Sequence, residues 1–349
     1  MKMTLHRLNL PLAHTFTIAR GSLDNQPSLI VELEHQAVQG FGEVTENSYY
    51  GHTLDSIARS LSQVAGMLER YLDHSPLDLW QEFYDRINGD TFALSALDMA
   101  AHDLRGKLLN RPTWKELGLS WQDVPQSSFT IGIATIDEMV RKLHQQPGWS
   151  IYKIKLGTPH DLDIVAELRK HSTAVFRVDA NCGWSSEQTV TYSRALAQLG
   201  VEFIEQPLPI EASQAEKRRV FAESALPILA DEDCQVSDDV DRCHGLYHGI
   251  NVKICKCGGL TPAFFMLQRA RALGMKTMVG CMIESSIGIS GAAQLLPLLD
   301  YADLDGAVLL QDEPATGVRI VNGDVRQADS PGTGAKLLRE RLNSFAIEI

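Results

Sequence analysis

The sequence predicts an α/β protein in which a smaller α+β segment precedes a parallel barrel of eight strands. Three observations lead to this fold class. Eight short apolar runs alternate with amphipathic stretches from Ser127 onward. Three of these runs end in an acidic residue at equal spacing, whereas roughly the first 120 residues show strands followed by helices. Strands that alternate with helices lie parallel, and eight such units close into a barrel whose strand ends share one mouth.

The composition excludes several classes of protein. A chain of 349 residues can form one large domain and a smaller one, and 44% hydrophobic residues are ordinary for a globular protein. A formal net charge of −12 argues against nucleic acid or an anionic membrane as partner. The net charge says little about the substrate, because local charge in a pocket can oppose the global sign. The oligomeric state stays open, a homo-oligomer included.

The N-terminus and the cysteines predict a cytoplasmic location. No basic segment followed by a long apolar core opens the chain, so no signal peptide is expected. No run approaches the ~18 apolar residues of a membrane span. The six cysteines lack a disulfide or zinc spacing, and Cys255 and Cys257 lie too close together for the usual zinc knuckle. Reduced thiols are the expected state.

The N-terminal segment reads as three antiparallel strands followed by three helices. Residues 3–12, 27–36 and 39–46 alternate between apolar and polar side chains, with glycines at the turns. Apolar residues then recur at helical spacing, and the predicted helices are Leu54–Leu72, Pro76–Ile87 and Thr91–Leu109.

The eight barrel strands are predicted from the apolar runs that follow. They are SFTIGIA, IYKIKLG, VFRVDA, VEFIEQP, PILADED, INVKICK, KTMVGCM and YADLDG. An open doubly wound sheet is the competing architecture, but no Gly-rich dinucleotide loop follows any of these strands. After the last strand, Asn322-Gly323 predicts a hairpin. We expect this tail to return to the N-terminal segment.

Asp179, Glu205 and Asp231 form the strongest chemical signal, because each ends a strand and 26 residues separate each from the next. One such residue would most simply be a helix cap or a solvated carboxylate. Three at the same height in a barrel would repel one another strongly unless a cation lay between them. Three carboxylates with open positions suit a hard ion such as Mg²⁺. The sequence therefore predicts a metal site.

Lysines lie on both sides of this acidic series. Lys153 and Lys155 share one face of the strand before it, and Lys253 lies on the strand after it. One interpretation is a buried ion network that only neutralises the carboxylates. The other is that Lys155 and Lys253 face opposite sides of one bound carbon, their pKa values lowered by burial and a nearby dication. Lys256 is expected to point away and to be secondary.

Three further signals carry less information. Asp303 and Asp305 could capture an ammonium group or form an exposed acidic turn. Glu284 and the serines that follow it could cap a helix or line the pocket. His102, on an alanine-rich helix, is interpreted as a packed histidine.

These motifs together resemble the enolase superfamily, specifically its muconate-lactonizing subgroup. The resemblance covers nearly the whole chain and rests on KIK at Lys153 to Lys155, VDAN at Asp179 to Asn181, IEQP ending at Pro207, ADE ending at Glu232 and NVKICKCGG from Asn251 to Gly259. It implies a modified TIM barrel, (β/α)7β, over residues 123–317. It also implies an N-terminal α+β capping domain over residues 1–122, completed by about 318–349.

Within the subgroup, GCMIES and DLD (Asp303 to Asp305) resemble dipeptide epimerases of the Ala-Glu or D-Ala-D-Ala type. The resemblance implies an isomerase that inverts the α-carbon of the C-terminal residue by two-base 1,1-proton transfer through a Mg²⁺-stabilised enediolate. It implies that Lys155 and Lys253 are the acid/base pair and that Asp179, Glu205 and Asp231 bind the metal. The implied substrate contacts are Thr130, Lys153, Cys281, Ile283, Asp303 and Asp305.

Two departures from the family pattern are Asp233 in ADED and Cys182 in DANCGW, and neither replaces an implied ligand or base. Capping loops around Ile18 to Ser22 and Tyr49 to Thr53 are expected to cover the site.

Two alternatives remain at this stage. One is a different enolate-forming enzyme of the same fold, such as an o-succinylbenzoate synthase, a cycloisomerase or an N-acylamino acid racemase. Their substrates lack a free ammonium in the expected position, so the Asp303/Asp305 pair argues against them. The other alternative is a non-catalytic binding barrel whose charges are structural.

Overall fold

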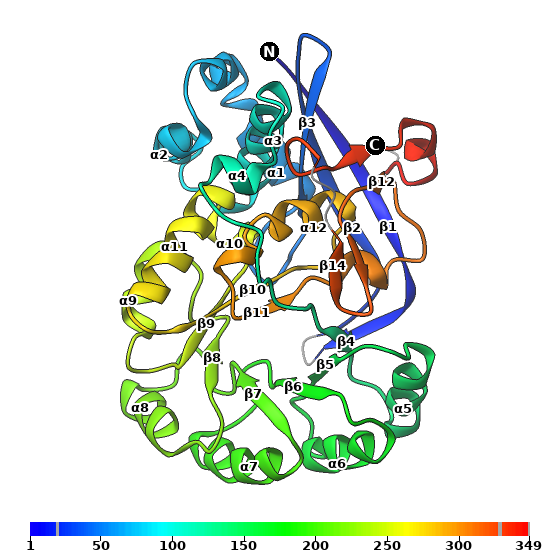
Figure 1. Cartoon of the computed structure of the whole chain (residues 1–349), viewed down its shortest axis with the longest axis vertical. Coiled ribbons are helices and arrows are strands. Elements are labelled where there is room, and N and C mark those ends of the chain that lie inside the picture. The colour runs from blue at the N-terminus through cyan, green and yellow to red at the C-terminus, as the bar shows by residue number, and fades with distance from the viewer. Residues whose placement is uncertain (19–20, 327–329, 348–349) are drawn as a thin grey trace.

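The computed structural model describes residues 1–18, 21–326 and 330–347 and has two parts (Figure 1). The first contains an antiparallel sheet in the order β1 (Lys2–Ile18), β2 (Gly21–His35) and β3 (Val38–Thr45). The predicted three strands are therefore confirmed. Both faces of β2 are buried, because successive residues such as Leu29 and Ile30 point to opposite faces and pack into two different hydrophobic clusters.

The predicted helices follow the sheet, with one correction. α2 (Pro76–Arg86) and α3 (Thr91–Leu108) match the expectation closely, but the segment predicted as one helix is divided. α1 ends at Ser62, and the chain continues as a 3-10 helix, η1 (Ala65–Leu72). Gly66 has low helix propensity. The apolar periodicity continues across this region, so it did not predict that the α-helix would end at Ser62.

α3 lies directly against β3 because two glycines allow the backbones to approach. A Cβ on Gly42 would lie 2.0 Å from the carbonyl oxygen of Ala96, and one on Gly40 would lie 2.4 Å from that of Ala100. Glycine is needed wherever another backbone approaches this closely. We call the β1–β3 sheet with α1–α3 the cap; it lies beside the second part and packs against it (Figure 1).

The second part is the predicted parallel barrel. Its strands pair in sequence order from first to last, and the edges meet where Ser127 forms a parallel bridge with Ala302. The strands are β4 (Phe129–Ile131), β5 (Ile151–Lys155), β6 (Val175–Asp179), β7 (Val201–Glu205), β8 (Ile228–Ala230), β9 (Gly249–Val252), β10 (Lys276–Gly280) and β11 (Tyr301–Asp303). Seven helices connect them along the outside: α5 (Ile136–Gln145), α6 (Asp161–His171), α7 (Ser186–Gln198), α8 (Gln214–Glu223), α9 (Ser237–Cys243), α11 (Leu260–Ala272) and α12 (Ser286–Ala293) (Figure 1).

The interior of the barrel below the mouth is filled by side chains. Phe203, Leu229 and Met278 form a buried cluster, and the Arg177 guanidinium lies 5.4 Å from the Phe203 ring. Arg177, Phe203 and Leu229 each precede an acidic residue by two positions. Because side chains two apart in a strand share a face, the same pleat that fills the barrel aims the acidic residues into its mouth.

The C-terminal tail runs beside the cap. β13 (Arg319–Val321) and β14 (Asp324–Arg326) form the predicted hairpin at Asn322-Gly323. Beyond β12 (Ala315–Thr316) and β15 (Lys336–Leu337), η4 (Arg339–Ser344) brings the chain beside β1, where Asn9 N donates to Phe345 O at 2.7 Å. Residues 327–329 and 348–349 of this expected segment lie outside the described residues. No helix in the described part is both long and apolar enough to cross a membrane.

Candidate active site

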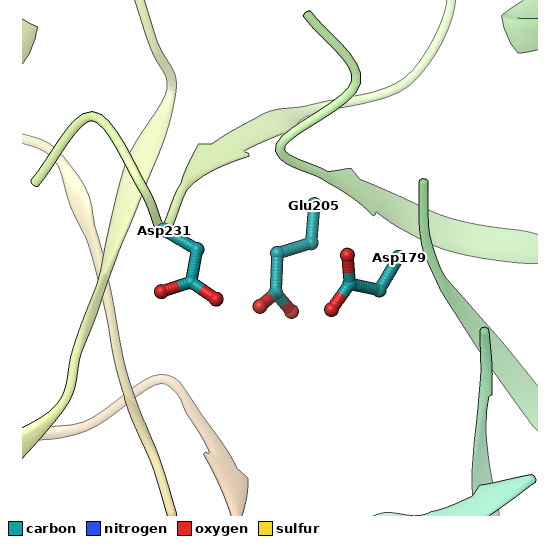
Figure 2. A group of neighbouring side chains, drawn as sticks. All are labelled: Asp179, Glu205 and Asp231. Carbon is teal, nitrogen blue, oxygen red and sulfur yellow. The ribbon is translucent and has the colours of Figure 1, made fainter. Parts of the chain in front are cut away.

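The structure brings Asp179, Glu205 and Asp231 together at the mouth of the barrel. Asp179 and Glu205 end β6 and β7, and Asp231 follows β8 directly. Each residue offers a carboxylate oxygen, and the three oxygens lie within 4.8 Å of one another. All three side chains are buried and point into one space from neighbouring strand ends (Figure 2). We call this group the acidic triad.

Amide groups hold the triad in place. Asn181 N donates to Asp179 Oδ1 at 2.9 Å, and Asn251 Nδ2 donates to Glu205 Oε1 at the same distance. The role of Asn251 was not predicted from the sequence. It lies on β9 two residues before Lys253, so the strand alternation that singled out the lysine was the available signal.

The triad fits a divalent cation. Two buried amide oxygens beside it, Asn181 Oδ1 and Asn251 Oδ1, accept no hydrogen bond among the described residues, and the Lys153 amine lies 2.8 Å from Glu205 Oε2. Burial and the neighbouring Asp179 carboxylate raise the pKa of Glu205 to about 8. The protein's own groups therefore leave this carboxylate short of positive charge, and Mg²⁺ is the hard, oxygen-binding dication that such a donor set accommodates.

Two lysines reach the triad from its two ends. Figure 2 shows Glu205 between the two aspartates. Lys155 Nζ lies 2.6 Å from Asp179 Oδ2, and Lys253 Nζ lies 2.9 Å from Asp231 Oδ2. Lys153 is also buried, with Nζ at 2.8 Å from both Glu205 Oε2 and Asp303 Oδ2. An amine is thus available at each end of the carboxylate row.

The protein's own charges do not produce the expected lowering of the pKa of Lys253. Burial alone would lower the pKa of Lys253, but Asp231 more than offsets it and the net pKa is well above its ordinary value. Burial and a dication lower a lysine pKa, whereas this direct ion pair raises it. A basic neutral amine at this position therefore requires positive charge bound at the triad.

The expectation that Lys256 points away is wrong. β9 ends at Val252 and the chain turns into the one-turn helix α10 (Ile254–Cys257), so strand alternation does not extend to Lys256. Its amine is buried and donates to the main-chain oxygen of Asp231 at 2.5 Å and to Asp231 Oδ1 at 2.6 Å. Lys256 therefore holds both the backbone and the carboxylate of this residue.

Asp303 and Asp305 lie together on the opposite wall of the mouth. Burial would raise the pKa of Asp303, but Lys153 outweighs it and lowers that pKa. Burial and the charge of Asp303 raise the pKa of Asp305 to about 7. Asp305 Oδ2 accepts from Thr130 N at 2.6 Å, and no ion pair with a cation is formed by its carboxylate in the described structure. This pair can accept one further positive group, and the alternative of an exposed turn is excluded because both residues are buried.

A cavity of about 910 Å³ opens above the triad between barrel and cap. Its lining includes both end lysines and every predicted substrate contact: Thr130, Lys153, Cys281, Ile283, Asp303 and Asp305. From the cap come residues of both expected loops, such as Ser22 and Tyr50. Residues 19–20 of the first loop lie outside the described part of the chain.

Glu284, Ser285 and His102 have structural contacts outside the cavity. Ser285 is the N-cap of α12, and the buried Glu284 accepts from Met282 N at 3.1 Å. His102 is a packed histidine, as predicted, with Nε2 2.9 Å from Thr261 Oγ1. Burial lowers the pKa of His102 to about 3. None of these side chains lines the cavity.

Comparison with known proteins identifies both parts of the chain. Residues 2–118 match the model described as the mandelate racemase/muconate lactonizing enzyme N-terminal domain. Residues 135–341 match the model described as enolase C-terminal domain-like.

Curated relatives are similar over nearly the full length. An L-Ala-D/L-amino acid epimerase of Flavobacterium johnsoniae is 48% identical over 338 residues, which cover 97% of this chain and 100% of the relative. The L-Ala-D/L-Glu epimerase of Escherichia coli is 31% identical, over 90% of this chain and 96% of its own.

Solved structures of dipeptide epimerases are similar to this chain over nearly its full length. The substrate-liganded L-Ala-D/L-Glu epimerase of Bacillus subtilis superimposes with a TM-score of 0.87 at 26% identity, covering 96% of this chain and 98% of that one. A Methylococcus capsulatus dipeptide epimerase complexed with Mg and L-Arg-D-Lys superimposes with a TM-score of 0.84 at 29% identity, covering 96% and 98%.

Proposed function

Because the chain belongs to the mandelate racemase/muconate lactonizing enzyme family of the enolase superfamily, we propose that it is a Mg²⁺-dependent dipeptide epimerase. It inverts the α-carbon of the C-terminal residue. The observation that carries this proposal is a buried acidic triad with one lysine amine at each end. Inversion by proton transfer requires two such groups on opposite sides of one carbon.

The acid/base roles belong to Lys155 and Lys253. One amine removes the α-proton from one face of the substrate, and the other amine delivers a proton to the opposite face. The two lysines exchange these roles when the opposite epimer is the substrate. Bound at the triad, Mg²⁺ supplies a Lewis acid that stabilises the negative charge developing on the substrate carboxylate. Lys153 is buried against Glu205, and its amine contributes a fixed positive charge beside the substrate carboxylate.

Selectivity for dipeptides belongs to the opposite wall. Asp303 and Asp305 accept the α-ammonium of the substrate, because Asp305 has no cation of its own and its charge is otherwise costly. Thr130, Cys281 and Ile283 line the space between this pair and the lysines. A substrate without a free amine would leave the two carboxylates unpaired. This feature favours a dipeptide epimerase over the other enolate-forming enzymes of the fold.

The boundaries and location also belong to the proposal. The capping domain comprises residues 1–122 completed by about 318–349, and the barrel comprises residues 123–317. A cytoplasmic location is supported by the cysteines, none of which forms a disulfide among the described residues. The substrate is a small molecule rather than nucleic acid or a membrane, and a homo-oligomer is compatible with it.

Deuterium exchange tests the function directly. The protein with Mg²⁺ is incubated in D₂O with a panel of dipeptides. The expected result is a gain of one mass unit at the C-terminal residue together with formation of the opposite epimer. A chelated sample is the control and should show neither. Full exchange in the chelated sample, or binding of dipeptides without any exchange, would exclude the proposed reaction.

A further inference from the structure

The two proposed bases are held by different kinds of structure. Lys155 is the last residue of β5 and is paired in register with Asp179 on β6. β9, by contrast, ends at Val252, so Lys253 lies one residue beyond it, as the N-cap of α10. Its carbonyl oxygen accepts from Lys256 N at 3.0 Å and from Cys257 N at 3.2 Å. The position of Lys253 therefore depends on the segment that follows it, and not on the sheet. We call this segment, residues 254–261, the turn; it comprises α10, two glycines and the first residues of α11.

Two cap residues bind the far end of the same turn. Trp80 Nε1, on α2, donates to the carbonyl oxygen of Gly258 at 2.7 Å. Asp98, on α3, accepts from Thr261 N at 2.9 Å and from Thr261 Oγ1 at 2.8 Å. Asp98 is buried. These bonds join positions 163 and 178 residues apart in the chain, so they are formed only when the cap lies on the barrel.

The cap packs so closely against this turn that only glycine fits at positions 258 and 259. Gly258 and Gly259 have φ values of +99° and +134°, which side chains other than glycine rarely adopt. A Cβ on Gly259 would lie 2.3 Å from Asp98 Oδ2, and one on Gly258 would lie 2.9 Å from the Trp80 ring. The turn is therefore shaped to receive these two cap side chains.

From the barrel side the turn is held by Lys256. Its amine donates to the main-chain oxygen of Asp231 and, at 3.3 Å, to that of Cys234. Each side of the turn thus has its own set of bonds. Loss of the cap set would leave the Lys256 amine as the side chain that ties the turn to the barrel, and the backbone that carries Lys253 could then shift relative to the substrate carbon.

We infer that Trp80 and Asp98 are positioning residues for Lys253, through which the cap controls one of the two proton-transfer faces. This inference rests on the proposed function. It predicts asymmetry, because no corresponding cap contact is needed for Lys155, which the sheet holds. A displacement of a catalytic group by about 1 Å can reduce the rate about 100-fold.

Face-specific exchange is the test. The initial rate of deuterium incorporation is measured separately for each epimer of one dipeptide with the Mg²⁺-loaded enzyme. Lys253→Ala first identifies which epimer depends on Lys253, as the epimer whose exchange it abolishes. Asp98→Ala is then expected to slow exchange of that epimer at least 10-fold and to slow the other less than 3-fold. Trp80→Phe, which removes only the indole donor, should show the same asymmetry to a smaller extent.

Two comparisons separate positioning from a general loss of stability. Asp98→Asn retains an acceptor for Thr261 N and should restore the rate toward that of the wild type. Asp103→Ala is the matched control, because Asp103 is equally buried on α3 but accepts from Phe41 N and Thr333 N, away from the turn. It should slow both epimers equally or not at all.

The outcomes are distinct. Equal slowing of both epimers by Asp98→Ala and Trp80→Phe, or no slowing by either, would overturn the inference while leaving the epimerase intact. If Asp98→Ala does not fold, the Trp80→Phe result decides. Absence of exchange in the wild type would instead overturn the proposed function itself.

Discussion

Two groups of buried carboxylates in this molecule are bound in opposite ways. The acidic triad in the barrel is bound mainly by the amines of Lys155, Lys253 and Lys153. The carboxylates at the interface between cap and barrel are bound by backbone N–H groups and hydroxyls. Glu43, for example, accepts from Ser285 N at 3.1 Å, Ser285 Oγ at 2.5 Å and Gly288 N at 3.0 Å, all at the start of α12.

The difference separates stability from chemistry. A carboxylate at a helix N-terminus is stabilised by the N–H donors and by the helix dipole, and it needs no further partner. Three carboxylates within one small space repel one another, and their mutual repulsion is relieved only by cations. The interface carboxylates therefore join the two parts of the fold. The triad lowers the stability of the folded protein until a cation binds, and its role is to bind that cation.

Substitution in the triad should produce the largest effect on activity. Glu205→Gln keeps the shape and the acceptor for Asn251 but removes a ligand charge. Metal catalysis contributes several kcal/mol, so exchange of both epimers should fall at least about 1,000-fold. Thermal unfolding without Mg²⁺ should show unchanged or higher stability, because one of three like charges is gone. A large loss of stability would contradict the distinction between the two groups.

Lys253→Ala should divide the reaction instead of ending it. Epimerisation requires both amines, and its rate should fall about 10²- to 10⁴-fold, the usual contribution of an acid/base group. Lys155 can still exchange the proton of the epimer that faces it, with retention of configuration. Mass spectrometry and chiral chromatography on the same sample distinguish these events. Unchanged turnover of both epimers would refute the assignment of two bases.

Asp305→Asn should have a smaller effect that depends on the substrate. A hydrogen bond to a charged group contributes about 1.5–3 kcal/mol, so kcat/KM for dipeptides should fall roughly 10- to 100-fold. The N-acetylated analogues have no ammonium group and should lose much less. Steady-state kinetics on matched pairs of substrates measures the ratio. Equal losses for both would remove the ammonium role of this residue.

At the interface, Asp98→Asn should change the pH dependence of stability. Burial raises the pKa of Asp98 from 3.8 to about 7. The folded protein therefore retains a proton that the unfolded chain releases, and the stabilisation present below pH ~4 is lost as the pH rises to about 7. The unfolding free energy of the wild type relative to Asp98→Asn should fall over this range by a few kcal/mol at most. A constant difference between the two proteins would contradict the raised pKa.

Much of the barrel and its triad could be predicted because both depend on local order along the chain. Each strand is a short apolar run, and the strands pair in sequence order, so equal spacing places Asp179, Glu205 and Asp231 at one height. The same regularity predicted that Lys155 and Lys253 would flank them. It failed at Lys256, where the strand had already ended, and at residues 63–64, where the predicted helix divides into two segments.

The sequence by itself determined the order of the elements, the fold class and the charged residues at the strand ends, since these follow from periodicity and composition within short windows. Only the tertiary structure decided which amine pairs with which carboxylate, and that Trp80 and Asp98 bind the turn after β9. Those contacts join residues far apart in the chain, and their geometry depends on how the cap rests on the barrel. No local pattern encodes that arrangement, because it results from the packing of two separately formed surfaces.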